Sequence, residues 1–291
     1  MKAKWKNEDN IAALIFLMPF LIVYALFMLY PIAKGFMISL SEWSIGMKPV
    51  FVGFKNYIIM FQDPYFWEAI WNTVFFVLIS TPALIIVGLC LALIVNSKLK
   101  GTIFLRSAFF LPYVLSISVM ASIWMFILQP HTGLLNAILH NLGLKQEVFW
   151  LDDANLAWFS ILIATVWWTV GFNMILFLAG LQEIPEDYYE AAQLDGANTW
   201  RQFISITLPS LKGVLLLTVV LQTIASFKLF GQPYLMTQGG PGTATRTLVQ
   251  YIYEKAFYEQ QMGIASSMSY VLFFITILFA FIQFKFLSNK N

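Results

Sequence analysis

The stretch EAAQLDGANTWRQFISITLP, residues 190–209, differs from the chain around it. The flanking sequence is apolar and aromatic, whereas this stretch holds two acids, an Asp-Gly pair, an arginine and a final proline. Asp195-Gly196 predicts a turn or the end of a helix, because glycine adopts left-handed backbone angles at little cost. We therefore expect two short helices with a bend between them.

The first of these helices is predicted to begin just before the stretch, at Pro185. Proline fits the first turn of a helix, and the acids Glu186 and Asp187 complement the positive end of the helix dipole. Ala191 and Ala192 give this helix a flat face of small side chains. Such a face lets the backbone of another chain come close.

The second helix has Asn198 as its expected cap and Pro209 as its expected end. Its apolar side chains recur at helical spacing and form one stripe: Trp200, Phe203, Ile204, Thr207 and Leu208. Residues 183–209 are thus predicted to be an amphipathic helical hairpin. On periodicity alone, an interfacial helix with a solvated acidic face explains the segment equally well.

The composition of the whole chain is that of an integral membrane protein. Of its 291 residues, 59% are hydrophobic and 11% are charged, and the mean hydropathy is +0.74. Soluble domains carry about 25% charged residues, so lipid must solvate much of this surface. The net charge of +2 and the scattered aromatic residues give no indication of nucleic-acid binding.

Long windows without acidic or basic residues predict six transmembrane helices, since about 20 apolar residues cross the hydrocarbon core. A barrel strand would instead show about 10 residues of alternation. The expected spans are approximately 11–33, 70–96, 104–128, 156–182, 209–230 and 263–286. Pro112-Tyr113 is expected to break the third span, and Lys228 to reach the interface from the fifth. The predicted fold is all-α, with residues 1–291 as a single transmembrane domain.

Lysine and arginine predict the orientation of these helices. The cytoplasmic side is expected to hold the denser set of basic residues. That set is Lys2, Lys4, Lys6, Lys98, Lys100, Arg106, Arg201, Lys212, Lys285 and Lys290. The opposite set spreads over longer loops: Lys34, Lys48, Lys55, Lys145, Lys228, Arg246 and Lys255. Six spans then place both termini in the cytoplasm, with an uncleaved first helix, because the first apolar run is too long for a signal peptide.

The sequence carries no signature of catalysis. It has no phosphate-binding loop of the form G-x-x-x-x-G-K-[ST] and no G-x-S-x-G, so ATP hydrolysis by this chain is not expected. No pair of carboxylates lies within a predicted span, which argues against a proton-coupled carrier. Cys90 is predicted to be a buried small hydrophobe, and His131 and His140 to be ordinary loop residues. We expect no cofactor or metal in this chain.

The order of residues in the opening stretch resembles the EAA motif of permease subunits of bacterial and archaeal ATP-binding-cassette importers. That motif reads E-A-A-x-x-x-G, about nine further residues, then I-x-L-P. The matching residues are Glu190, Ala191, Ala192, Gly196, Ile206, Leu208 and Pro209. The Asp-Gly-Ala version is similar to the carbohydrate branch of maltose, multiple-sugar and glycerol-phosphate type. The stretches VGFKNY, DPYFWEAIWNT, RSAFFLPYVLS and MTQGGPGTATRTLVQYIY extend the resemblance over nearly the whole chain.

The resemblance implies a type I importer permease with a cytoplasmic coupling helix, in the cytoplasmic membrane of a bacterium or archaeon. It implies a second homologous permease, two ATPase subunits that hold ATP and Mg, and an extracytoplasmic solute-binding protein. The coupling residues that it implies are Glu190, Ala191, Ala192, Asp195, Gly196, Ala197, Arg201 and Pro209.

A sugar crossing such a bundle needs hydrogen-bonding and aromatic side chains on otherwise apolar helices. Polar or broken points on the third, fourth and fifth spans supply them, and the resemblance implies contacts on the same three helices. The candidates are Tyr113, Ser116, Ile117, Thr165, Trp168, Thr169, Asn173, Ser226 and Leu229. The competing interpretation is that Ser and Thr in membrane helices bond their own backbone.

An oligosaccharide is the expected substrate. A glycerol-phosphate or a polyol is the alternative, but no Lys or Arg lies deep in a predicted span to receive a phosphate. A self-sufficient carrier or channel, with the hairpin as a mere interfacial anchor, is the rival of another class.

Overall fold

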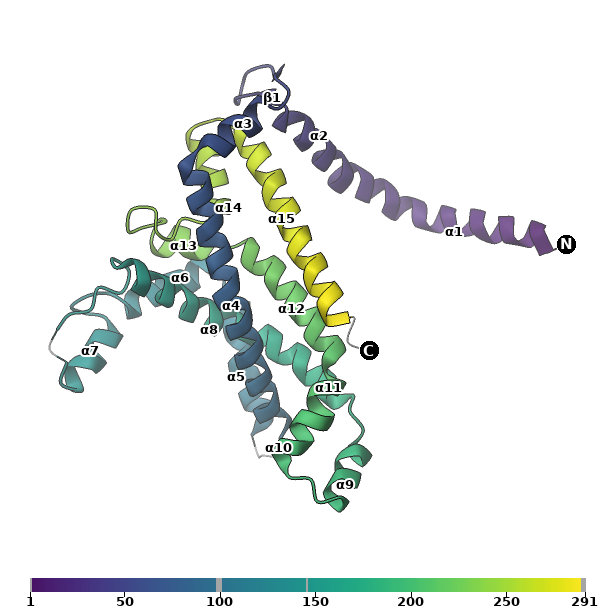
Figure 1. Ribbon diagram of the computed structural model, residues 1–291, viewed down its shortest axis with the longest axis vertical. Helices are drawn as coiled ribbons and strands as arrows, with labels where there is room; N and C mark the ends of the chain where they lie inside the picture. The colour runs from purple at the N-terminus through teal and green to yellow at the C-terminus, as the bar shows by residue number, and fades with distance from the viewer. Residues whose placement is uncertain (1, 98–100, 145, 289–291) are drawn as a thin grey trace. The chain divides into compact units, whose positions relative to one another are not determined.

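Figure 1 shows a computed structural model that describes residues 2–97, 101–144 and 146–288. Almost all of its regular structure is helical. The chain divides into two compact units. One unit takes in the chain up to Asp63 together with Ile252–Val271, and the other takes in Pro64–Tyr251 together with the chain from Leu272 onward.

The first unit begins with a long, uninterrupted helical segment. It consists of α1 (Lys2–Tyr24), a π-helical turn (Ala25–Leu29) and α2 (Tyr30–Ser39). An antiparallel pair of short strands, β1 (Ser41–Glu42) and β2 (Val50–Phe51), and then α3 (Lys55–Gln62) follow. The buried amide of Asn56 donates to the carbonyl oxygens of Ser39 and Ser41, at 2.8 and 2.9 Å, and so fixes α3 to the end of α2.

The first ten residues of α15 (Met262–Ser288) complete this unit. A Cβ at Gly263 would lie 2.1 Å from the carbonyl oxygen of Ser41, so only glycine permits this approach. The hydroxyl of Tyr270 donates to the carbonyl oxygen of Ile32 in α2. The start of α15 therefore packs on α2 and on the loop that follows it.

The second unit contains the remaining helices. They are α4 (Pro64–Asn96), α5 (Thr102–Val114), α6 (Ile117–Ile127), α7 (Leu134–Asn141), α8 (Ala154–Gln182), α9 (Glu186–Leu194), α10 (Thr199–Gln202), a π-helical turn (Phe203–Thr207), α11 (Leu208–Ser210), α12 (Lys212–Phe227) and α13 (Gly231–Met236). The short α14 (Leu248–Tyr253) crosses from this unit into the first, which holds another π-helical turn (Glu254–Tyr258).

Glycines allow close helix contacts in the second unit, as small residues do in membrane bundles. A Cβ at Gly88 of α4 would lie 2.9 Å from the Cβ of Asn173 in α8. A Cβ at Gly171 of α8 would lie 2.3 Å from the carbonyl oxygen of Phe109 in α5. The backbones of α4, α8 and α5 therefore approach to near contact.

Among the described residues, four helices are long and apolar enough to cross a membrane: Ala12–Ser39, Pro64–Asn96, Ala154–Gln182 and Met262–Lys285. Two bent pairs, Thr102–Val114 with Ile117–Ile127 and Thr199–Ser210 with Lys212–Phe227, bring the number to six if each pair is one span. The helix expected at 209–230 differs from α12 at both ends. Pro209 belongs to α11, which precedes α12, and α12 ends at Phe227.

The span expected over 104–128 is broken, as Pro112-Tyr113 predicted, since α5 and α6 meet at 102°. Leu115 has extended backbone angles, and the Ser116 hydroxyl caps α6 by accepting from the Val119 amide at 3.4 Å. The break therefore comes after Pro112, which α5 retains as an interior residue. The indole N–H of Trp168 donates to the carbonyl oxygen of Leu115 at 3.1 Å and satisfies an acceptor at the break.

Cys90 also departs from its prediction, because it is exposed on α4 rather than buried. An apolar run predicts burial only in a water-soluble domain. A helix solvated by lipid places small apolar residues on its outer face as readily as on its inner face.

Candidate functional site

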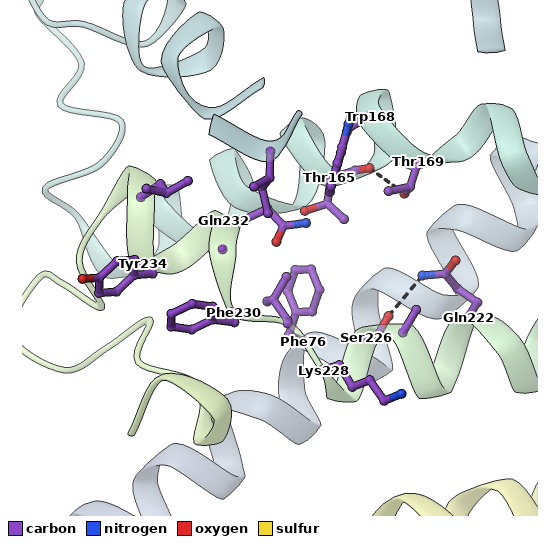
Figure 2. A pocket seen from close by; sticks show the side chains of 15 residues that line it. Phe76, Thr165, Trp168, Thr169, Gln222, Ser226, Lys228, Phe230, Gln232 and Tyr234 are labelled. Carbon is purple, nitrogen blue, oxygen red and sulfur yellow. Dashed lines mark hydrogen bonds between the residues drawn. The ribbon is translucent and has the colours of Figure 1, made fainter. Parts of the chain in front are cut away.

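A cavity of about 560 Å³ opens in the second unit (Figure 2). Its volume lies in the range of about 300–1,000 Å³ that is typical of small-molecule sites. Side chains from α4, α6, α8, α12 and α13 meet there. The lining residues are Phe76, Ile117, Thr165, Trp168, Thr169, Gln222, Ala225, Ser226, Lys228, Leu229, Phe230, Gly231, Gln232, Tyr234 and Leu235.

The lining combines aromatic rings with hydrogen-bonding groups. The rings of Phe230 and Tyr234 are stacked, with centroids 5.0 Å apart and planes 23° apart. Figure 2 shows the amide of Gln232 between Trp168 and the ring of Phe230. Aromatic faces with a few placed polar groups can hold a ring whose faces are apolar and whose edge carries hydroxyls.

Six of the nine predicted path residues line this cavity: Ile117, Thr165, Trp168, Thr169, Ser226 and Leu229. The other three lie elsewhere. Tyr113 stacks on Phe172, with ring centroids 5.3 Å apart, and Ser116 caps α6. Asn173 is buried behind the lining, where its amide donates to Oε1 of Gln222 at 3.2 Å.

The lining hydroxyls on α8 bond to their own helix, as the competing interpretation expected. Thr165 donates to the carbonyl oxygen of Ile161, and Thr169 donates to that of Thr165, each at 2.7 Å. On α12, the Ser226 hydroxyl is 2.9 Å from that of Ser80 in α4. The Ser226 oxygen also accepts from Nε2 of Gln222 at 3.3 Å. The two threonine oxygens each keep acceptor capacity, because a hydroxyl has two lone pairs.

The sequence prediction missed the part of the lining that follows α12. The chain turns there and returns to the cavity in α13, so Phe230, Gln232 and Tyr234 become lining residues. A Cβ at Gly231 would lie 2.1 Å from Cδ1 of Ile117, which shows how closely α13 approaches α6. Gly231 and Pro233 were the available signal that the predicted helix stops and another begins.

Lys228 has a place in the lining that the sequence did not predict. It lines the cavity at the end of α12. The cavity therefore includes one cationic side chain among the described lining residues.

The hairpin of residues 183–209 is held by local hydrogen bonds. Gly196 has a φ of +77°, which glycine adopts without strain. The side chain of Asn198 accepts from the Arg201 amide at 2.9 Å and caps α10. The side-chain amide of Gln202 donates to the carbonyl oxygen of Ala197 at 2.9 Å.

The surface of this hairpin is largely exposed. Of the implied coupling residues, Ala192 and Ala197 are half-buried, and the exposed ones are Glu190, Ala191, Asp195, Gly196, Arg201 and Pro209. Two apolar side chains stand out: Leu194 is 90% exposed and Trp200 is 68% exposed. Figure 1 shows α9 and α10 at the lower end of the view, well below α13. The hairpin is joined directly to α8, which carries three of the cavity residues.

His131 and His140 share an acidic neighbour that their spacing did not predict. Each ring has a nitrogen 3.5 Å from Oε1 of Glu147. This arrangement is an ion pair only when a histidine is protonated. In the described part of the chain, no three His, Cys, Asp or Glu side chains are arranged to hold a metal ion.

Comparisons with known proteins agree with the fold. The Trehalose/maltose transport system permease protein MalF of Thermococcus litoralis is 37% identical, over 98% of this chain and 96% of its own. The "Probable ABC transporter permease protein YurN" of Bacillus subtilis is 39% identical, over 96% of this chain and 97% of its own.

A solved structure has the same fold. It is a crystal structure of a bacterial alginate ABC transporter in complex with alginate pentasaccharide-bound periplasmic protein. One of its chains matches with a TM-score of 0.83 at 23% identity, over 96% of this chain and 95% of that one.

The predicted all-α permease fold and the resemblance found in residues 190–209 are therefore both confirmed. The family described as binding-protein-dependent transport system inner membrane component matches residues 66–289. The chain belongs to this family of inner-membrane subunits of ABC importers.

Proposed function

We propose that this chain forms half of the translocation pathway of an ATP-driven oligosaccharide importer and receives its driving force through residues 183–209. The observation that carries the proposal is a cavity of sugar-sized volume whose α8 wall runs directly into an exposed hairpin. A site and a coupling surface on one continuous segment of chain can be driven together.

The lining of the cavity supports a sugar as the substrate. Stacked rings, two glutamine amides and several hydroxyls suit a ring with apolar faces and a polar edge. The relative MalF is named for trehalose and maltose, and the solved neighbour was crystallised with an alginate pentasaccharide-bound protein. Together they favour a substrate of two or more sugar rings.

The exposure of the hairpin supports docking of an ATPase. Leu194 and Trp200 are apolar side chains left without cover, and no residue of α9 is buried. Local hydrogen bonds give the hairpin one shape, so it can pass on a displacement. It does so only if the two states of the ATPase bind it differently.

An ATP-driven importer of this kind requires further subunits. We expect a second permease of this family, two ATPase subunits that carry ATP and Mg, and an extracytoplasmic solute-binding protein. The distribution of lysine and arginine supports cytoplasmic termini and a cytoplasmic hairpin. This chain then contributes no catalytic residue and no cofactor of its own.

Purification followed by transport tests the proposal. We expect a second permease and an ATPase to co-purify with this chain, and the complex to import oligosaccharides into proteoliposomes only with ATP and a binding protein. Leu194→Asp should release the ATPase, because it places a charge in the docking surface. Leu142→Asp is the matched control, since Leu142 is 75% exposed directly after α7, outside the hairpin. Transport by this chain alone without ATP would refute the proposal.

A further inference from the structure

Lys228 gives the cavity a positive charge that its other lining residues do not offset. No Asp or Glu is among the described residues that line it. Within the described part of the chain, the Lys228 ammonium has neither an ion pair nor a hydrogen bond. Lys228 is exposed in this structure, so its flexible side chain can turn toward an occupant of the cavity.

The cavity has two chemically different ends (Figure 2). Phe230 and Tyr234 stack at one end. Lys228 lies with Ser226 and Gln222 on the side formed by α12, and its amine points away from the stacked rings. An occupant that spans the cavity would meet aromatic surface at one end and a cation at the other.

An occupant that covers this strongly hydrated ammonium withdraws it from water, which is costly unless an anion replaces the lost water. A neutral sugar offers it only hydroxyl oxygens. A carboxylate, sulfonate or phosphate forms a charge-assisted hydrogen bond, which is about twice as strong as a neutral one. An anionic occupant thus gains most from this lining.

We propose that the transported sugar carries an anionic group and that Lys228 is the residue that receives it. The stacked rings of Phe230 and Tyr234 would hold a neutral ring of the same molecule. This inference rests on the proposed function and names its substrate class as acidic oligosaccharides. The alternative is a purely structural role, in which Lys228 only stabilises the negative end of the α12 dipole.

Uptake of a matched pair of substrates by the assembled complex distinguishes an anion-binding role of Lys228 from a role in the helix dipole alone. The pair is an oligouronide and its methyl ester, which differ in charge and share one ring framework. We expect Lys228→Met to lower uptake of the oligouronide roughly tenfold to a hundredfold, the range for a lost charged hydrogen bond. The ester should change less than about threefold, and Lys228→Arg should retain most uptake of both. A sulfonated sugar and a sugar phosphate of similar size identify which anion is preferred.

Restoring a positive charge at residue 228 by chemical modification tests the charge itself. If Lys228 had only a structural role, restoring the charge would not restore uptake. Lys228→Cys is made in a Cys90→Ala background, because Cys90 is exposed and would also react. An aminoethyl thiol reagent rebuilds a cation at residue 228, whereas a methyl thiol reagent adds only apolar bulk. We expect the first reagent to restore uptake of the oligouronide and the second to leave it low.

Three results would overturn the inference: equal losses for the acid and the ester, restoration by the methyl reagent, or import of neutral sugars alone. Failure of the proposed function is distinct. In that case the unaltered complex would import no sugar of either kind with ATP, and the inference would fall with it.

Discussion

The hairpin of residues 183–209 and the cavity lie in the same unit but are built in opposite ways. The hairpin is one contiguous segment, and its bend is fixed by bonds between residues three to five positions apart. The cavity takes its lining from segments between Phe76 and Leu235, which are distant in sequence. The hairpin should thus be sensitive to backbone conformation and the cavity to side-chain chemistry.

The largest effect is expected from Gly196→Val in the hairpin. A Cβ there would meet no atom within 4 Å, so the damage comes from the φ of +77° alone. A left-handed conformation costs an L-residue about 1–2 kcal/mol, and more when the residue is β-branched. We expect ATP-dependent uptake to fall roughly tenfold or more while the amount of protein in the membrane stays normal.

Gly213→Val is the matched control for that substitution. Gly213 also has open space around an added Cβ, but its φ is ordinary. Uptake by this variant should stay above half of the unaltered value. If Gly196→Val keeps full uptake, conformation at the bend does not matter and the comparison between the two regions fails.

A smaller effect is expected from Trp168→Ala in the cavity. The change removes both an aromatic surface and the hydrogen bond to Leu115, and we expect a loss of uptake of roughly tenfold. Trp168→Phe keeps a ring and loses only the bond. Its uptake, measured with the same sugar, should lie between those of the alanine variant and the unaltered protein. Equal uptake by all three would remove Trp168 from the path.

The smallest effect is expected from Tyr113→Phe. Tyr113 stacks on Phe172 outside the cavity lining, and phenylalanine preserves that stack. Uptake should therefore change by less than about twofold. A larger loss, measured as the initial rate, would mean that the Tyr113 hydroxyl meets the substrate in another state of the importer.

The difference between the locally built hairpin and the cavity explains which parts of the molecule could be predicted from sequence. The ends of α9, the bend at Gly196 and the cap at Asn198 follow from local chemistry, because each depends on residues a few positions apart. The apolar windows likewise located helices that α4, α8 and α15 now occupy. Local signals suffice where the structure itself is local.

The rest depended on contacts that no local signal contains. Pro112-Tyr113 predicted a break in the third span, but its place at Leu115 depends also on Trp168, much later in the chain, which donates to the Leu115 carbonyl oxygen. The return of α13 into the cavity requires Gly231 to meet Ile117. Lys228 follows an apolar run, as lysines at the membrane interface do. It lines the cavity because α12 ends directly before it.

The contact between Gly171 and Phe109 has a consequence for how the bundle can move. Two backbones this close cannot rotate past each other, because even one added methyl group would lie 2.3 Å from a carbonyl oxygen. We expect α5 and α8 to turn as one body, with the bond from Trp168 to Leu115 carrying the end of α5 along. A push on the hairpin would then reach the cavity as a rotation of one whole wall, without slip between the helices.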